Sequence, residues 1–213
     1  MHRLGPGATV RFTGAPTDRF IYLWQGGVEA GGAKLGPRSS AIVEYGSSLI
    51  LTARSDGASV LAFSLRERGP DERLGGHVHL LPNERVPRID QVGGKAVGMA
   101  LHADSQCPTC KLWFHENDYF GAGEVTAVHS HSEDEVIFVR AGTIRVGNRL
   151  YGAGTALAIA AHTKYGFSSG PGGLSFVNFR GKSPTYTSAD GAVVLDEAQL
   201  WRSHLARPQY LEG

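Results

Sequence analysis

The stretch GEVTAVHSHSEDEVIFVRAG, residues 123–142, contains the pattern Gly-x5-His-x-His-x3-Glu-x6-Gly, with His129, His131 and Glu135 as its polar members. Side chains two positions apart in a strand project from the same face, so His129 and His131 point together. A tight turn after them can return Glu135 to that face. Two imidazoles and one carboxylate, with coordination positions left open, favour a catalytic metal ion over a closed structural site. The sequence therefore predicts one divalent transition metal, which is iron, manganese, nickel or zinc.

This spacing, with its bracketing glycines, resembles the first conserved motif of the cupin superfamily residue for residue. The second cupin motif usually reads Gly-x5-Pro-x-Gly-x2-His-x3-Asn, and the corresponding run here is GTALAIAAHTKYGFSS from Gly154 to Ser169. In that run Tyr165 takes the place of the late histidine, which is the usual fourth ligand, and His162 takes the place of the second glycine. The resemblance implies an all-β fold of the jelly-roll type, also called a double-stranded β-helix, with a metal at His129, His131, Glu135 and the Tyr165 position.

An internal repeat extends the resemblance to the first half of the chain. Residues 20–63 align without a gap onto residues 136–179 at a constant offset of 116, with seven identities in 44 positions, four of which are glycine. These glycines separate apolar runs, where a tight strand connection needs a residue that accepts positive φ. Self-similarity at domain length predicts two related units. We therefore expect two tandem cupin-type β-barrels. The ligand positions of the first one fall on Thr13, Ala15, Arg19 and Leu49, so that copy has lost the metal site.

The predicted domains are residues 1–95, a degenerate cupin with a connecting segment, residues 96–185, the metal-binding cupin, and residues 186–213, a helical tail. The few residues before position 20 leave too short a chain for a full set of early strands. We therefore expect the first barrel to take one or two short strands from residues 64–97. In the tail, apolar residues recur with helical spacing and Pro208 ends the run, which predicts an amphipathic helix of about three turns on the barrel surface; these residues are Val194, Ala198, Trp201 and Leu205.

Two residues beside the metal motif are the candidate catalytic groups. Tyr165 has three interpretations: fourth metal ligand, proton donor over an open metal position, or an aromatic residue that lines the barrel. A phenol near a metal can act as a general acid or hold a substrate oxyanion. His162 stands at the rim of the predicted barrel as a polar substrate contact or an alternative ligand, or as a solvated residue.

Cys107 and Cys110 form CPTC, flanked by His102 and His115. If Pro108 and Thr109 form a two-residue hairpin turn, alternation puts the two histidines on the opposite face from the two cysteines, which argues against a four-ligand zinc site. Reduced thiols are the favoured interpretation, followed by a local disulfide and then by zinc. His115 is separately a candidate to line the barrel cavity. The pair His77 and His79 lacks a carboxylate in the cupin register and is interpreted as a solvated strand face.

Composition limits the classes of function. Lys plus Arg number 21 and Asp plus Glu number 20, so no global charge favours nucleic acid or an anionic membrane. No apolar stretch approaches the roughly 20 residues of a membrane span. The first residues, MHRLGPGATVRF, do not resemble a secretory leader, so we expect a cytoplasmic location. The expected partner is a small molecule, without nucleic acid or membrane and with a homodimer left open.

The resulting hypothesis is a metal-dependent cupin enzyme that acts on a small polar organic substrate. Dioxygenase chemistry comes first because it is the commoner use of a centre with two histidines and one carboxylate, and a Lewis-acid isomerase or lyase comes second. The alternative is a bicupin without catalytic activity that binds a small molecule or regulates another process.

Overall fold

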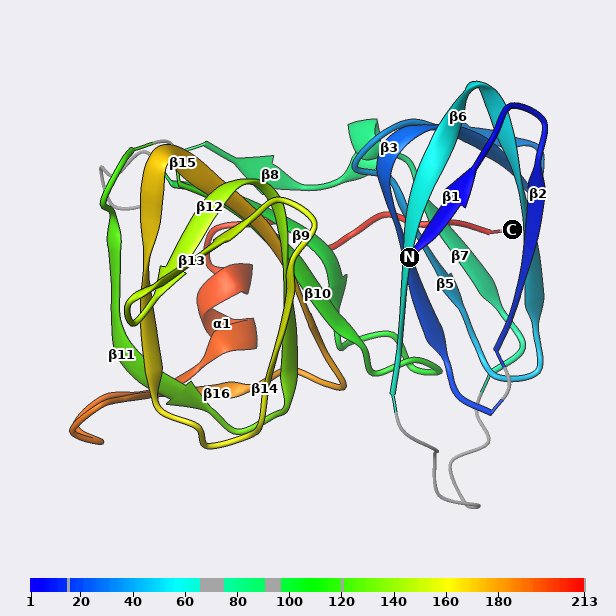
Figure 1. The fold of residues 1–213 in the computed structure, drawn as a ribbon. Helices are drawn as coiled ribbons and strands as arrows, with labels where there is room; N and C mark the ends of the chain where they lie inside the picture. The colour runs from blue at the N-terminus through cyan, green and yellow to red at the C-terminus, as the bar shows by residue number, and fades with distance from the viewer. Residues whose placement is uncertain (15, 66–74, 91–96, 120, 213) are drawn as a thin grey trace. The chain divides into compact units, whose positions relative to one another are not determined.

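The computed structural model describes residues 1–14, 16–65, 75–90, 97–119 and 121–212. None of the helices in these ranges is long and apolar enough to cross a membrane. The chain divides into two compact units (Figure 1). Unit 1 consists of Met1–Val86, Cys107–Cys110 and Pro208–Gly213, and unit 2 consists of Pro87–Gln106 and Lys111–Arg207.

Unit 1 is an antiparallel sheet that curls on itself, with the strand order β1-β6-β3-β5-β7-β18, while β2 pairs with β6 and β4 pairs with β3. Strand β7 lies within the segment 64–97, so the first barrel does take a strand from it, as expected. The strands are β1 (His2–Leu4), β2 (Thr9–Thr13), β3 (Arg19–Ala30), β4 (Ala33–Leu35), β5 (Ser40–Val43), β6 (Ser48–Ser64), β7 (Val78–Leu81) and β18 (Leu211–Glu212), with a 3-10 turn at Asn83–Arg85.

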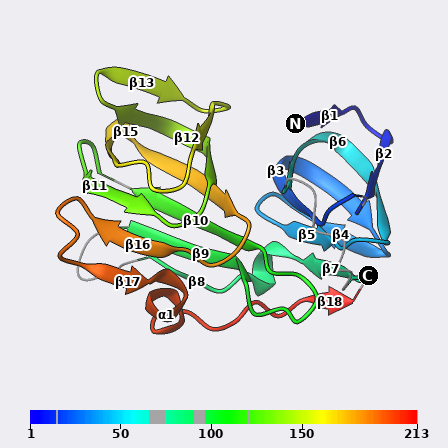
Figure 2. The same ribbon diagram turned by 90° about the horizontal axis from the view of Figure 1, so that it is seen from below.

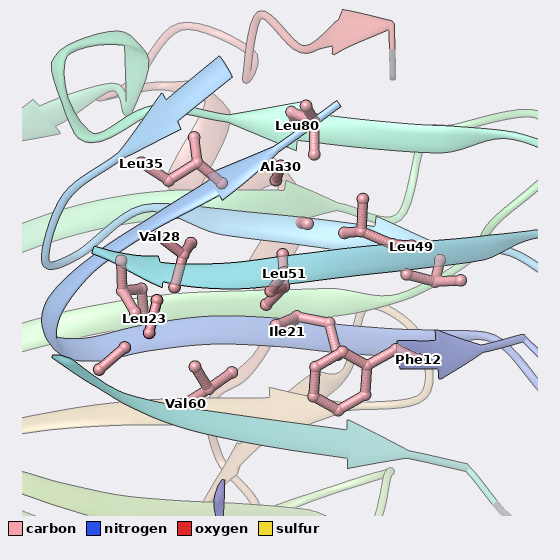
Figure 3. Packing of buried hydrophobic residues seen from close by; sticks show 14 residues of the cluster. Phe12, Ile21, Leu23, Val28, Ala30, Leu35, Leu49, Leu51, Val60 and Leu80 are labelled. Carbon is pink, nitrogen blue, oxygen red and sulfur yellow. The ribbon is translucent and has the colours of Figure 1, made fainter. Parts of the chain in front are cut away.

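The interior of unit 1 is filled with apolar side chains (Figure 3). Alternate residues of β2, β3 and β6 point inward, and Phe12, Ile21 and Leu51 are each at most 3% exposed. Leu49, which stands where unit 2 has Tyr165, is part of this core. Thr13 is exposed, and Ala15 lies outside the described residues. At these two described positions the first repeat therefore has an ordinary surface residue, Thr13, and an ordinary core residue, Leu49.

Unit 2 is a second antiparallel sheet, with the order β17-β16-β11-β15-β10-β9-β8, while β12 pairs with β13, β14 and β15. Its apolar interior is formed by residues such as Ile137, Val139 and Phe176. The elements are β8 (Arg88–Ile89), β9 (Val97–Asp104), β10 (Trp113–Tyr119), β11 (Val125–His131), β12 (Glu135–Val146), β13 (Arg149–Gly152), β14 (Ala156–Ile159), β15 (Tyr165–Arg180), β16 (Thr185–Ser188), β17 (Val194–Asp196) and helix α1 (Glu197–Arg202).

The offset of 116 residues relates the strands of the two units. Strands β3 and β12 begin and end 116 residues apart, and so do β5 and β14. The pairs β3–β6 and β12–β15 each have two register shifts, at equivalent positions of the two units. The first shift falls between Leu23 and Gln25 in unit 1 and between Val139 and Ala141 in unit 2. Gly26 and Gly142 follow with φ of 72° and 69°, and an added Cβ would lie 2.0 Å and 2.3 Å from a backbone oxygen of the opposite strand. Only glycine fits such positions.

The C-terminal helix is shorter than expected. Val194 belongs to β17 and is 60% exposed, so including it in the apolar face was wrong. Ala198, Trp201 and Leu205 are buried and pack against residues of β9 and β10 of unit 2. Figure 2 shows the short helix α1 following β17. Asp196 caps the helix, because its side chain accepts hydrogen bonds from the backbone N–H groups of the first turn. The chain uses the preceding residues for a strand that pairs with β16, and this pairing shortens the helix.

Candidate metal centre in the C-terminal barrel

The three motif residues lie on adjoining ends of two strands of unit 2. His129 and His131 are on β11 and Glu135 opens β12, and all three are at most 7% exposed. Tyr165 opens β15 directly opposite His129 in the sheet. The alternation of β11 turns both imidazoles to one face, as the sequence predicts, and their ring centroids lie 4.8 Å apart.

Both imidazoles have their Nδ1 atoms beside an oxygen atom. His129 Nδ1 lies 2.7 Å from the carbonyl oxygen of Ala127, which fixes this nitrogen as the donor. His131 Nδ1 lies 2.6 Å from Glu197 Oε1, a close contact that is not aligned as a hydrogen bond. A metal-binding histidine usually directs its second nitrogen to a carbonyl or carboxylate in this way, and this leaves Nε2 available as the ligand.

The Glu135 carboxylate has one occupied and one free oxygen. Its Oε2 accepts hydrogen bonds from Asn178 Nδ2 at 2.6 Å and from an Arg180 guanidinium nitrogen at 2.7 Å. Its Oε1 is buried and has no hydrogen-bond partner among the described residues. Arg180 also contacts Glu197 Oε2 at 3.0 Å, so one buried cation lies against two carboxylates. Burial alone would raise the pKa of Glu197, but Arg180 and His131 lower it to about 2.

Two imidazoles and one carboxylate are suitable ligands for a divalent transition metal, but their donor atoms lie too far apart to bind one ion together. Ligand bonds of about 2.0–2.2 Å require donor atoms within roughly 4 Å of one another. Within the part of the chain that the structure describes, His129, His131 and Glu135 do not form a group whose donor atoms all lie within 4.8 Å of one another. Binding of one metal ion by all three residues therefore requires a side-chain movement. Glu135 Oε1 would break no hydrogen bond in such a movement, because it has none.

Tyr165 lies over the histidines as a neutral phenol. Its ring centroid is 4.6 Å from that of His129 and 6.3 Å from that of His131. Burial and the nearby Glu135 carboxylate raise the pKa of Tyr165 above its usual value of 10, because a phenolate there would be desolvated and repelled. Burial and the carboxylate therefore both favour the neutral phenol of Tyr165 over its phenolate.

A cavity of about 370 Å³ is lined by His129 and His131, whereas Glu135 is not among its lining residues. His115 lines it, as the sequence suggested, and so does Tyr165. His162 does not line it: its side chain is exposed, and its backbone N–H donates to the His131 carbonyl at 2.7 Å. His162 has φ of 62°, a conformation that explains why the cupin motif has glycine there. A substrate contact by His162 stays a prediction.

Several residues around the site were not found from the sequence. Tyr186 stacks on His129 with centroids 5.0 Å apart, from a strand beyond the repeated region. Arg180 and Asn178 lie at the end of β15, two positions apart, and Glu197 comes from helix α1. The available signal was an apolar strand that ends in Asn-x-Arg. Asn and Arg side chains are rarely buried unless they have polar partners, so their position predicts a polar group nearby.

Comparisons with known proteins identify the architecture. No protein-family model matches the sequence, and no curated protein sequence matches it. A single-residue variant of Bacillus subtilis oxalate decarboxylase aligns with a TM-score of 0.60 at 13% identity, covering 96% of this chain and 71% of that chain. A Lactobacillus farciminis oxalate decarboxylase–formate complex aligns with a TM-score of 0.64 at 11% identity, covering 85% and 78%. The fold is that of a double cupin. In this double cupin, unit 1 is the barrel with the apolar interior, and unit 2 carries the motif residues.

Proposed function

We propose that the C-terminal cupin is the site of a metal-dependent enzyme that acts on a small polar organic substrate. The observation that carries the proposal is the state of the donors: the Nδ1 atoms of His129 and His131 each lie beside an oxygen atom, and Glu135 Oε1 is buried without a hydrogen bond. A buried carboxylate oxygen left unpaired is costly, and a cation removes that cost. The proposed ligands are His129 Nε2, His131 Nε2 and Glu135 Oε1.

A divalent metal held there supplies Lewis acidity toward a carbonyl or carboxylate oxygen of the substrate. The chain's own residues do the rest. Asn178 and Arg180 hold Glu135 by its second oxygen, and Glu197 orients His131. Tyr165 donates a hydrogen bond or a proton to the oxygen or carbon on which negative charge develops. The largely apolar wall that includes Phe167, Phe176 and Ile137 limits water around the substrate.

A proton donor in place of the fourth ligand favours a lyase or isomerase over a dioxygenase. Similar structures give this choice one further support, since a Bacillus subtilis oxalate decarboxylase described with Mn(II) centres has a TM-score of 0.61 at 13% identity, covering 96% of this chain and 71% of that chain. We therefore propose a small carboxylic acid as the first substrate class and decarboxylation as the first reaction to test. Manganese is then the first metal to test at this site.

Metal analysis combined with a substrate panel tests the proposal. The wild type, His131→Ala and Tyr165→Phe, each loaded with manganese or iron, are incubated with oxalate and other small mono- and dicarboxylates while carbon dioxide and oxygen uptake are measured. We expect His131→Ala to lose metal and turnover. Tyr165→Phe should keep its metal and lose about 10²-fold or more in turnover, because it lacks the proton donor.

His204→Ala, which removes an exposed imidazole from the same unit, is the matched control and should keep both properties. Retention of all bound metal by His131→Ala would overturn the metal assignment. If the wild type binds metal stoichiometrically but converts none of the acids in the panel, the enzyme proposal is contradicted. This result would favour a double cupin that binds a ligand without converting it.

A further inference from the structure

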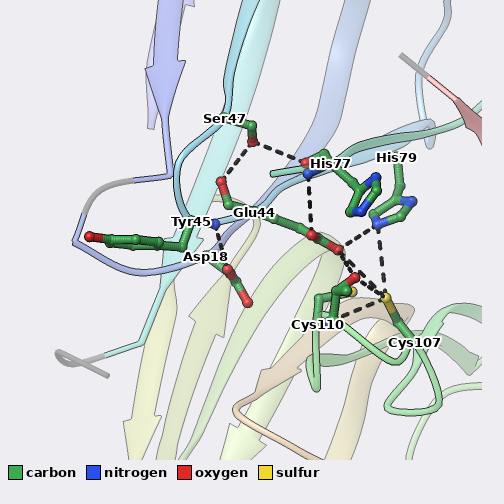
Figure 4. Close-up of polar contacts among 9 residues, drawn as sticks. Asp18, Glu44, Tyr45, Ser47, His77, His79, Cys107 and Cys110 are labelled. Carbon is green, nitrogen blue, oxygen red and sulfur yellow. Dashed lines mark hydrogen bonds and ion pairs between the residues drawn. The ribbon is translucent and has the colours of Figure 1, made fainter. Parts of the chain in front are cut away.

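A second group of potential metal ligands lies in unit 1, apart from the cupin motif. Glu44 follows the end of β5, His79 lies on the adjacent strand β7, and Cys107 and Cys110 belong to the CPTC turn. Their donor atoms, one from each residue, all lie within 4.8 Å of one another. Figure 4 shows the carboxylate, the imidazole and the Cys107 sulfur converging.

The separations match those of a tetrahedral zinc site. With Zn–S bonds of about 2.3 Å and Zn–N or Zn–O bonds of about 2.0 Å, a tetrahedron has S···N and S···O edges of about 3.6 Å and an N···O edge of about 3.3 Å. Cys107 Sγ lies 3.8 Å from His79 Nε2 and 3.6 Å from Glu44 Oε1. His79 Nε2 and Glu44 Oε1 are 2.6 Å apart, so among these three edges this one must lengthen to admit the ion. The Cys110 sulfur lies within 4.8 Å of the other three donor atoms.

The surroundings of these residues favour a bound cation. Glu44 is fully buried at 0% exposure and Cys110 is 1% exposed, so a carboxylate and a thiol are held away from water. Cys107 is half-buried, which leaves an entry path for an ion.

A second layer of contacts orients the ligands. The Cys110 backbone N–H donates to Cys107 Sγ at 3.2 Å, and Thr109 Oγ1 donates to Glu44 Oε1 at 2.5 Å. The other oxygen of Glu44 accepts the His77 backbone N–H at 3.3 Å. His79 packs against the Tyr210 ring with centroids 5.3 Å apart. Such outer partners fix the ligand geometry before an ion binds.

We propose that Glu44, His79, Cys107 and Cys110 form a structural zinc site in the N-terminal cupin. Four protein donors complete a tetrahedron and leave no open position, which is typical of structural rather than catalytic zinc. Thiolates select zinc over manganese, so the two units are expected to take different metals. The site is independent of the activity proposed for unit 2.

On the sequence alone, zinc ranks last at CPTC and His79 is expected on a solvated strand face; this expectation for His79 was wrong, because its side chain is buried against Glu44. His102 and His115 are indeed not ligands: His102 pairs with Glu116 at 3.1 Å, and His115 lines the cavity of unit 2. His115 pairs with Leu101 across the sheet, not with His102. The other two ligands come from residues far away in the sequence.

Zinc content of the full-length reduced protein is the first test. We expect about one zinc ion per chain that survives dialysis, and a loss of that equivalent in Cys107→Ser, in Cys110→Ser and in His79→Gln. His77→Gln is the matched control, because this exposed imidazole lies two residues away and is not a proposed ligand: its ring stacks on that of His79 with centroids 6.0 Å apart, and its backbone N–H donates to Glu44. The zinc content of this variant should stay unchanged.

Cobalt substitution of the wild type gives a second readout that needs no variant. Tetrahedral cobalt with two thiolates has strong visible bands and a sulfur-to-cobalt charge-transfer band, and we expect both. Cobalt bound without the charge-transfer band, or zinc content unchanged in a folded Cys107→Ser, Cys110→Ser double variant, would overturn the proposal. So would a reduced wild type that retains no zinc and forms a Cys107–Cys110 disulfide in air, which would indicate a redox pair.

Discussion

Replacing Arg180 with methionine removes the guanidinium that contacts both Glu135 and Glu197. The Arg180 side chain is 2% exposed, and the two carboxylate side chains are 1% and 8% exposed. Breaking a buried ion pair from one side costs about 3–5 kcal/mol, because the remaining charge is neither solvated nor compensated. Here two carboxylates lose the same cation, so we expect a loss at the upper end, about 4–5 kcal/mol.

Scanning calorimetry of the full chain measures this loss. In a protein of this size 1 kcal/mol shifts Tm by about 2–4 °C, which predicts a fall of about 8–20 °C in the transition of unit 2. The control is Lys182→Met: Lys182 pairs with Glu133 at 3.3 Å, but the two side chains are 64% and 22% exposed. An exposed pair contributes about 0–1 kcal/mol, so the control should shift Tm by no more than about 4 °C.

A double variant and an added metal ion test whether uncompensated carboxylate charge causes the loss of stability. Combining Arg180→Met with Glu197→Gln removes one of the two uncompensated charges and should recover part of the lost Tm. A divalent metal at the cupin motif should likewise narrow the gap between Arg180→Met and the wild type, because it places positive charge beside Glu135. A fall in Tm for Arg180→Met no larger than that for Lys182→Met would refute the charge-compensation argument.

Two more predictions concern unit 2. Gly142→Ala places a Cβ 2.3 Å from the Gly173 carbonyl oxygen at a φ of 69°, so thermal unfolding should show a loss of about 1–3 kcal/mol; Gly147→Ala, at a φ of 56° with nothing within 4 Å, should lose less, and equal losses would contradict the steric argument. His115 accepts a hydrogen bond from Trp113 Nε1 at 2.9 Å, and burial together with Arg180 lowers its pKa to about 3. The unfolded chain then binds a proton that the folded chain excludes, so stability should fall by up to about 1.4 kcal/mol per pH unit as pH drops from 6.5 toward 3. In urea unfolding, His115→Gln should flatten this slope, and an unchanged slope would show that other groups cause it.

The strand framework could be predicted because it is a local and repeated property of the sequence. The offset of 116 residues relates the strand boundaries, the irregularities and the positive-φ glycines of the two units. Alternation along β11 placed His129 and His131 on one face for the same reason. The helix at the C-terminus was harder, since Val194 fits a helical period as well as it fits the short strand that it occupies.

The partners around each site could not be predicted, because they come from separate elements. Glu197 reaches His131 from α1, and Arg180 reaches Glu135 from β15. In unit 1, Glu44 contacts Thr109 and Cys107, which lie 65 and 63 positions later in the sequence. His102 and His115 are outside the group of potential ligands, but the parity argument assumed a two-residue turn that places them opposite each other, and this was wrong: β9 ends at Asp104, β10 begins at Trp113, and His115 pairs with Leu101. Parity along one hairpin also carries no information on residues outside that hairpin.

The sequence by itself determined two jelly-roll repeats, one with a metal motif and one without, since glycine positions and apolar alternation follow from backbone sterics and burial within each strand. The tertiary structure alone decided which polar side chains meet. It brought Glu44 and His79 to the CPTC turn and left one oxygen of Glu135 without a partner. The physical reason is that ligand and ion-pair geometry depends on separations of a few ångströms between side chains from distant segments, and these separations are fixed only when the sheets close.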